Sequence, residues 1–297
     1  MNNRVDLTDS SMEGLTEIDR LTGSAYLLHD LIRERLGLSL DAHDGTSSLL
    51  SRLAGRVRTA GCESVLEYYD LLLSGEGTAE EEWRQLAVVL AKPKSGFWRH
   101  TEAVRTLVEV ALPRLASTSP DEPIRIWSAC CSTGEEPLSI AMGLNEAGWF
   151  ERAAIQIHAS DASFESIDQA KRGLYADMRV NQLDVSLGDK YFKREKDGWR
   201  VVPELHQRIQ WKLANLMDEK EVAELARSHV IFCRNVFIYF TGHAICKTLR
   251  LFAQFMPAGA YLFSDSGEFF RALVSSSNQF EPLSNESSVW IRRGDAG

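Results

Sequence analysis

A loop of small residues, 128–136, joins an apolar stretch to a helical pattern and ends in Glu135 and Glu136. Backbone N–H groups can approach a ligand closely in such a loop. The loop has one glycine, Gly134, and lacks the GxGxxG pattern of dinucleotide-binding sites. Two glutamates at the start of a helix would repel a pyrophosphate and attract an ammonium group. The loop therefore favours a cationic ligand over a phosphate.

Another acid, Asp161, directly follows the apolar stretch 155–160. An acid at the end of a strand commonly receives ribose hydroxyls in nucleoside-binding sheets. The structural alternative is that Glu135 is only an N-terminal helix charge and Asp161 only an N-cap residue. Spacing alone favours that alternative, and the surrounding pattern decides between the two.

The elements that would position these acids alternate along the chain. Apolar stretches at 124–127, 155–159, 229–233 and 261–264 predict strands, and the segments 135–147, 164–173 and 244–255 predict helices. This alternation predicts a parallel sheet flanked by helices. Within it, Asp197-Gly198 predicts a type I′ turn between strands 191–196 and 199–202, and thus a small inserted hairpin.

The rest of the chain predicts further units. Residues 1–91 show helical spacing, for example at Leu28, Leu31, Ile32 and Leu36, and predict an all-helical N-terminal domain. Residues 92–123 predict a linker and a connecting helix. Residues 124–297 are predicted to form the α/β domain, with the β-subdomain inserted at about 185–210.

Composition limits the classes of function that this chain can have. The net charge is −9, with 33 Lys plus Arg against 42 Asp plus Glu, which opposes general nucleic-acid binding. The five cysteines form no CxxC pair, so no metal site is expected; Cys130 and Cys131 are expected to fill the loop, and His100 to lie at the surface. With no signal peptide and no apolar run of roughly 18 residues, a soluble cytoplasmic protein is expected.

Several motifs occur in a familiar order. The segment 124–142 (IRIWSACCSTGEEPLSIAM) and the segment 231–240 (IFCRNVFIYF) closely resemble signatures of the CheR family of chemoreceptor glutamate methyltransferases. Shorter matches lie at 96–99, 170–175, 191–192 and 215–216. The resemblance implies a Rossmann-like S-adenosylmethionine-dependent methyltransferase sheet with a small inserted antiparallel β-subdomain, preceded by an all-α domain.

The resemblance also implies a site. It places S-adenosylmethionine, whose product is S-adenosylhomocysteine, against these residues: Ser95, Arg99, Glu135, Asp161, Asn215, Leu216, Asn235 and Val236. This cofactor has an ammonium and a sulfonium but no phosphate, in agreement with the charge of the loop. Glu135 suits its amino end, Asp161 its ribose, and Arg99 its carboxylate or the incoming one.

Methyl transfer to a glutamate needs no general base, since a carboxylate with a pKa of about 4.3 is already ionised at neutral pH. Alignment and the exclusion of water must then supply most of the catalysis. The resemblance puts Arg99 and Tyr239 at the family's active-site positions. We expect Tyr239 to orient the reactants and Arg99 to hold acidic groups.

Departures from the family pattern keep one alternative open, and a second stays open because the sequence fixes the donor site far better than the acceptor site. Pro93 replaces a common Asn, and Asp265-Ser266-Gly267 replaces a common Gly-His-Ser. One alternative is a cofactor-binding regulatory module with weak or no activity. The other is a methyltransferase that acts on a different signalling protein or on a small acid.

The expected partner is the cytoplasmic helical domain of a chemoreceptor. Arg52, Arg56 and Arg58 lie in a segment without acids and are candidates for docking it, the alternative being an ordinary solvated face. The resemblance adds that some members tether a C-terminal receptor peptide at a longer hairpin loop. The short turn at 196–199 predicts recognition without such a tether.

Overall fold

The computed structural model describes residues 26–39, 46–75, 77–90, 95–118, 122–264, 267–284 and 288–294. The chain divides into two compact units, Met1–Leu90 and Ala91–Gly297. The described part of the predicted connecting segment, residues 95–118, therefore belongs to the second unit. The departures at Pro93 and at Asp265-Ser266 lie outside the described residues.

The first unit is helical over its described part. Residues 26–36 are helical and are followed by α2 (Thr46–Thr59), α3 (Val65–Leu73) and α4 (Gly77–Leu90). Each helix places apolar residues three or four positions apart, and these side chains meet in one core. Its most buried members are Leu28, Ile32, Tyr68 and Leu86.

The second unit opens with one continuous helical stretch, formed by α5 (Thr101–Thr106), the π-helical turn η1 (Leu107–Ala111) and α6 (Leu112–Thr118). The large sheet follows, with the strand order β6-β2-β1-β7-β8-β10-β9. Its strands are β1 (Ile124–Ala129), β2 (Ile155–Asp161), β6 (Ile209–Leu213), β7 (Val230–Phe232), β8 (Tyr261–Phe263), β9 (Phe280–Pro282) and β10 (Val289–Arg292). Strands β1, β2, β6, β7 and β8 run parallel, and β10 runs antiparallel to both of its neighbours, β8 and β9.

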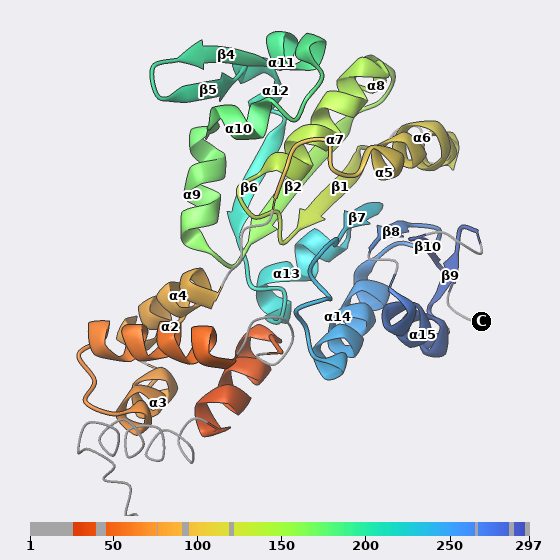
Figure 1. The fold of residues 1–297 in the computed structure, drawn as a ribbon. Helices are drawn as coiled ribbons and strands as arrows, with labels where there is room; N and C mark the ends of the chain where they lie inside the picture. The colour runs from red at the N-terminus through yellow and green to blue at the C-terminus, as the bar shows by residue number, and fades with distance from the viewer. Residues whose placement is uncertain are drawn as a thin grey trace, which may run out of the picture. The chain divides into compact units, whose positions relative to one another are not determined.

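Alternation along the strands builds a core on each face of this sheet. Ile126 of β1 packs in the core that includes α7 (Glu135–Glu146), whereas its neighbour Trp127 packs in the core that includes α14 (Gly242–Phe255). Other helices of this unit are α8 (Trp149–Arg152), α9 (Phe164–Arg172), α13 (Glu219–Ala226) and α15 (Glu268–Ser277). Helices thus cover both faces, and the predicted α/β fold is confirmed (Figure 1).

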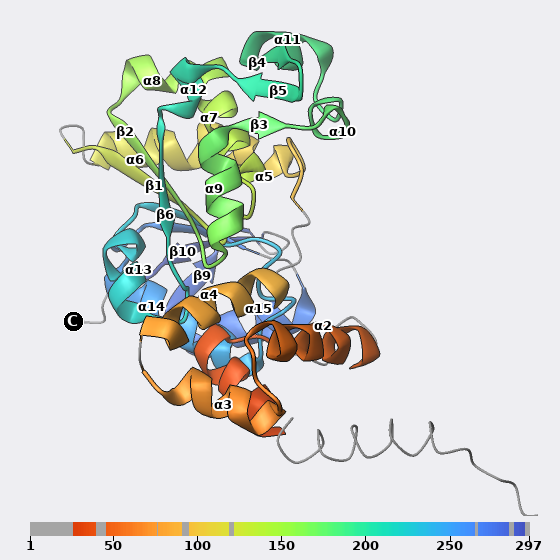
Figure 2. The ribbon, with the colours of Figure 1, turned by 90° about the vertical axis from the view of Figure 1, so that its left-hand side faces the viewer.

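The inserted element is a separate sheet with the order β3-β5-β4, drawn at the top of Figure 1. It comprises β3 (Leu174–Tyr175), β4 (Phe192–Glu195) and β5 (Gly198–Val201), and Figure 2 shows β3 and β5 side by side. The short helices α10 (Asp177–Val180), α11 (Val185–Tyr191) and α12 (Pro203–His206) accompany it. The predicted antiparallel β-subdomain is confirmed, with a third strand that the hairpin pattern did not indicate.

The turn of the hairpin differs from the predicted one. Glu195 pairs with Gly198, so the loop residues are Lys196 and Asp197, and neither has a positive φ. The prediction of a type I′ turn at Asp197-Gly198 is therefore wrong. Gly198 instead has a φ of 151° and passes Tyr175 so closely that a Cβ would lie 2.5 Å from its carbonyl oxygen. Strand β3 thus fixes this glycine as part of β5.

Candidate functional site

The strand order brings the predicted acids and amides to one edge of the large sheet. Strand β1 lies between β2 and β7, and the chain builds outward from β1 first on the β2 side and then on the β7 side. This is a topological switch point, where ligands bind outside the carboxyl ends of parallel strands. Asp161 ends β2, Asn215 closely follows β6, and Asn235 closely follows β7. Glu135 begins the helix that follows β1.

The loop between β1 and α7 is held tightly. The hydroxyl of Tyr175 donates to the carbonyl oxygen of Thr133 at 2.8 Å. Gly134 has a φ of 95°, and a Cβ there would lie 2.9 Å from the ring of Trp211 and 3.0 Å from the Tyr175 hydroxyl. Only glycine suits this position, because both the backbone conformation and the space exclude a side chain.

Asp161 is hydrogen-bonded to the backbone of the loop that follows β1. Its Oδ2 accepts from the backbone N–H of Ser132 at 2.8 Å and its Oδ1 from that of Ser163 at 2.9 Å. Burial raises the pKa of Asp161, while the hydrogen bonds from the backbone of Ser163, Ser132 and Ala162 act in the opposite direction. The buried Oγ of Ser132 has no hydrogen-bond partner in the protein. An unpaired hydroxyl beside a carboxylate with remaining lone pairs fits a ligand that carries hydroxyl groups.

Glu135 is a buried charge at the start of α7, with 1% of its side chain exposed. Its Oε2 accepts from the hydroxyl of Thr133 at 2.6 Å, and its Oε1 lies 3.7 Å from Nη1 of Arg179. A buried carboxylate needs counter-charge and hydrogen bonds. This environment suits the ammonium group of a ligand, which would add both.

Arg99 lies on a turn anchored by its neighbours. Phe97 is buried, with its ring 4.9 Å from that of Tyr175 and 5.1 Å from that of Phe192, both edge-on. The backbone N–H of Trp98 donates to Oγ of Ser139 at 3.0 Å. Ser95 is half-buried at the start of this segment, whereas Arg99 is exposed at its far end. The turn therefore fixes the backbone from which both predicted residues project.

His100 links this turn to the end of β7, and the expectation that it is a surface group is wrong. It is half-buried, and its Nε2 lies 2.9 Å from Oδ1 of Asn235 in a hydrogen bond. Burial and the charges of Arg234 and Arg99 lower the pKa of His100, against the opposing effect of the Asn235 hydrogen bond. The Arg99 turn and Asn235 thus belong to one constellation.

The other predicted residues form the turns after β6 and β7. Asn215 accepts from the backbone N–H of Met217 through Oδ1 at 3.0 Å, and its neighbour Leu216 is buried. Val236 is also buried, and its carbonyl oxygen accepts from the backbone N–H of Tyr239 at 2.9 Å. Tyr239 is half-buried in this turn, four residues beyond Asn235.

Backbone strain concentrates at the same edge. Among the described residues, five other than glycine have a positive φ: Trp98, Cys130, Ser132, Asn235 and Asn278. The first four belong to the three loops of the site. Such conformations persist where the surroundings enforce them, and they cluster at functional sites. Burial also raises the pKa of the Cys130 and Cys131 thiols, so neither provides a thiolate nucleophile.

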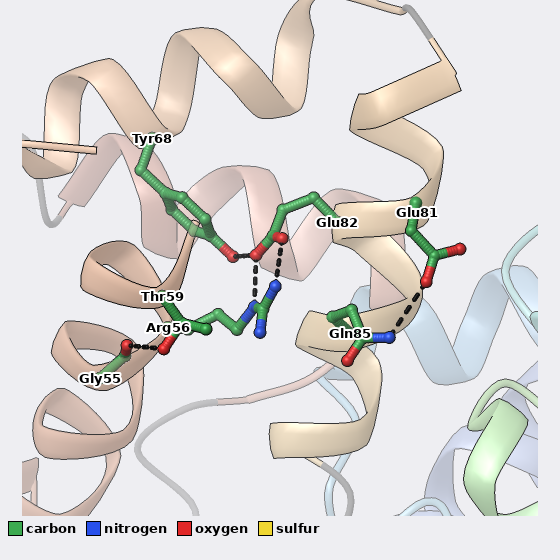
Figure 3. Close-up of polar contacts among 7 residues, drawn as sticks. All are labelled: Gly55, Arg56, Thr59, Tyr68, Glu81, Glu82 and Gln85. Atoms are coloured by element: carbon green, nitrogen blue, oxygen red, sulfur yellow. Dashed lines mark hydrogen bonds and ion pairs between the residues drawn. The ribbon is translucent and has the colours of Figure 1, made fainter. Parts of the chain in front are cut away.

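Of the predicted docking arginines, Arg56 needs a correction. Its Nε lies 2.6 Å from Oε1 of Glu82, whose carboxylate also accepts from the Tyr68 hydroxyl at 2.6 Å. Figure 3 shows both side chains pointing to this carboxylate inside the helical unit. Arg56 is therefore committed to Glu82, whereas Arg58 is exposed. The side chain of Arg52 lies outside the described residues.

Sequence reasoning missed Arg179, Thr133 and Tyr175 as parts of the site. Tyr175 lies in a recognised motif, 170–175, but nothing in the sequence indicates that its hydroxyl reaches the loop after β1. Across the described ranges, no group of three or more His, Cys, Asp or Glu side chains could hold a metal ion. No helix in the same ranges is long and apolar enough to span a membrane.

Comparisons with known proteins agree with this geometry. Residues 93–287 match the family model of the CheR methyltransferase SAM-binding domain, and residues 27–90 match that of the CheR methyltransferase all-alpha domain. Chemotaxis protein methyltransferase 2 of Pseudomonas aeruginosa is 34% identical over 251 residues, which cover 81% of this chain and 86% of that protein. Chemotaxis protein methyltransferase 2 of Vibrio cholerae is 32% identical over 228 residues, 75% of this chain and 78% of that protein.

A further relative is longer. The probable biofilm formation methyltransferase WspC of Pseudomonas aeruginosa is 28% identical over 265 residues. The match covers 89% of this chain but 60% of that protein.

Proposed function

The chain belongs to the CheR methyltransferase family, and from this premise we propose that it methylates glutamate side chains of a chemoreceptor to give glutamate methyl esters. The family match establishes an S-adenosylmethionine-dependent methyltransferase. The acceptor and the roles of individual residues belong to the proposal.

The residues at the sheet edge fit this cofactor. The unpaired Oγ of Ser132 and the Asp161 carboxylate suit the ribose hydroxyls. The buried Glu135 suits the ammonium. Asn215, Leu216, Asn235 and Val236 lie in the turns after β6 and β7, on either side of these acids in the strand order. The buried Leu216 and Val236 would cover apolar surface of the nucleoside.

Methyl transfer to a carboxylate requires the protein mainly to position the two reacting groups. The bound cofactor supplies a methyl group on a sulfonium, so that a glutamate oxygen forms the new bond to carbon while the carbon–sulfur electron pair stays on sulfur. The acceptor is already a carboxylate at neutral pH, and no residue has to remove a proton from it. Opposite charges disappear in this step, so side chains that exclude water and hold the two groups in line accelerate it.

Arg99 and Tyr239 are the residues that we assign to this positioning. Arg99 projects from the turn that His100 ties to Asn235, and its guanidinium can hold a carboxylate through two hydrogen bonds. Tyr239 follows Asn235 in the turn after β7, and its hydroxyl can orient the acceptor. The observation that carries the proposal is this link between an exposed arginine and the sheet edge that holds Asp161 and Glu135.

The experiment is transfer of labelled methyl groups to purified receptor cytoplasmic domains. The proposal predicts base-labile label, because a glutamate methyl ester releases methanol in alkali. Mass spectrometry should locate the label on glutamates. Base-stable label, or label on small acids only, would contradict the proposal.

The choice of receptor follows from the relatives. The names of these relatives include both chemotaxis and biofilm formation, so receptors from both kinds of pathway should be tested as acceptors. Binding of S-adenosylhomocysteine without methylation of any receptor would favour the regulatory module instead.

A further inference from the structure

Arg179 has no part in the site predicted from the sequence, yet it lies at Glu135. Its Nη1 is 3.7 Å from Oε1 of Glu135, an ion pair longer than a hydrogen bond. The arginine side chain is 32% exposed, whereas that of Glu135 is 1% exposed. The guanidinium therefore reaches from a solvent-accessible position to a buried carboxylate without closing a direct hydrogen bond on it.

The neighbours of Arg179 explain why it lies there. It belongs to α10, which follows β3, and Tyr175 at the end of β3 donates to the carbonyl oxygen of Thr133. Beyond α10, Oε1 of Gln182 lies so close to Gly96 that a Cβ on this glycine would be 2.8 Å away. The segment around α10 thus borders both the loop that leads to Glu135 and the segment that follows Ser95. This packing brings α10, and with it Arg179, to Glu135.

The chemistry of the ligand calls for a cation at this place. The amino-acid end of S-adenosylmethionine carries its ammonium and its carboxylate on the same carbon atom. If Glu135 receives the ammonium, the ligand carboxylate comes within a few ångströms of a buried anion. The ligand ammonium balances only one of these two negative charges, so a second cation beside them would balance the other. Among the described residues, Arg179 is the cation with a recorded ion pair to Glu135.

We propose that Arg179 holds the α-carboxylate of the cofactor while Glu135 holds its α-ammonium. The two side chains then form a clamp that binds both charged groups of an amino acid, the negative Glu135 facing the ammonium and the positive Arg179 facing the carboxylate. In this arrangement Arg179 determines specificity for an intact amino-acid end. The inference rests on the cofactor and not on the identity of the methyl acceptor.

A competing role for Arg179 predicts the opposite effect of its removal on ligand affinity. If Arg179 only neutralised Glu135 in the absence of ligand, the ligand ammonium would have to displace it. Removal of the arginine would then tighten binding. In the clamp, removal weakens binding, and only for ligands that carry the carboxylate.

Calorimetric titration of the whole chain distinguishes these roles. The probes are S-adenosylhomocysteine and its decarboxylated analogue, the same nucleoside thioether with an aminopropyl chain. Arg179→Gln should weaken binding of S-adenosylhomocysteine about tenfold or more, the loss expected for a charge-assisted hydrogen bond. Binding of the decarboxylated analogue should change less than twofold, and Arg179→Lys should retain part of the affinity for S-adenosylhomocysteine.

The matched control is Arg172→Gln. Arg172 lies at the end of α9, pairs with Asp168 at 3.2 Å and is 66% exposed, so its removal changes the net charge equally without touching Glu135. It should leave both affinities unchanged. Equal weakening of both probes by Arg179→Gln, no change, or tighter binding of S-adenosylhomocysteine would each overturn the clamp. Since no acceptor is present, these outcomes are independent of whether receptors are methylated.

Discussion

The contacts of Glu82 provide a test of how the helical unit is stabilised. Its side chain is 8% exposed, and it accepts hydrogen bonds from Arg56 and from Tyr68. Burial and the neighbouring Glu82 raise the pKa of Tyr68, so the phenol stays protonated and donates. We predict that Glu82→Leu destabilises this unit strongly, because it leaves a guanidinium and a hydroxyl without their acceptor.

The magnitude follows from the exposure of the partners. Breaking a buried ion pair by removal of one partner costs about 3–5 kcal/mol. The side chain of Arg56 is still 16% exposed, so water can solvate it in part, and we expect about 3 kcal/mol, the lower end of that range. Tyr68→Phe removes one hydrogen bond to a charged acceptor and should cost about 1.5 kcal/mol. The double variant Arg56→Met, Glu82→Leu should cost far less than the sum of its single changes, because no charge remains buried.

The assay must report on this unit specifically, since the two units need not unfold together. Hydrogen exchange of peptides from α3 and α4, followed by mass spectrometry, gives the opening free energy locally. The control is Glu81→Gln on the same helix α4. Glu81 pairs with Arg84 at 3.0 Å, but its side chain is 56% exposed, so the change should leave exchange as it is.

Two results would refute the reasoning. One is a cost for Glu82→Leu no larger than that for Glu81→Gln. The other is additivity of Arg56→Met and Glu82→Leu, which would mean that the two side chains do not interact energetically.

The remaining predictions concern the site and the acceptor. Burial raises the pKa of Asp161, so affinity for S-adenosylhomocysteine should begin to fall on acidification above the usual aspartate range of about 4, and calorimetry with Asp161→Asn should show no such fall. Arg99→Ala or Tyr239→Phe should slow methyl transfer at least tenfold with unchanged thermal unfolding; unchanged turnover would remove both from the site. Arg58→Glu should slow receptor methylation and flatten its salt dependence, whereas equal rates at every ionic strength would favour a solvated face. Truncation of the receptor C-terminus should leave methylation unchanged, because the loop at 196–197 is short; a large loss would contradict recognition without a tether.

The sequence predicts the large sheet well because each strand carries its own evidence. Alternation places Ile126 and Trp127 in different cores, and the helices between strands dictate parallel pairing. Parallel strands end at a common carboxyl edge, so the sequence alone predicts that Glu135 and Asp161 lie at the same edge of the sheet. Long-range side-chain partners carry no such local signal. Glu82 lies 26 residues from Arg56, and no spacing rule connects them.

The turn of the hairpin and the position of His100 show a second limit. The dipeptide Asp197-Gly198 has the right residues for a type I′ turn, but β3 pairs with β5 and draws Gly198 into the strand. Tertiary pairing thus overrides local turn preference. A lone histidine after an exposed arginine likewise gives no sign of the Asn235 side chain, which lies 135 residues further along the chain.

The loop after β1 shows both limits of prediction from the sequence, long-range partners without a local signal and tertiary contacts that override local preference. Cys130 and Ser132 adopt left-handed backbone conformations with φ of 56° and 51°, although a glycine at either position would avoid a cost of about 1–2 kcal/mol. Contacts with β2 offset this cost: the N–H of Cys131 donates to the carbonyl oxygen of Ser160 at 2.8 Å, and that of Ser132 donates to Asp161. With their N–H groups directed to β2, these residues do not form the open glycine cradle that a pyrophosphate needs. The same contacts that strain the loop therefore hold Asp161 against the residue with the unpaired hydroxyl, Ser132. One arrangement thus accounts for both expectations from the sequence, a loop unsuited to phosphate and a carboxylate available to ligand hydroxyls.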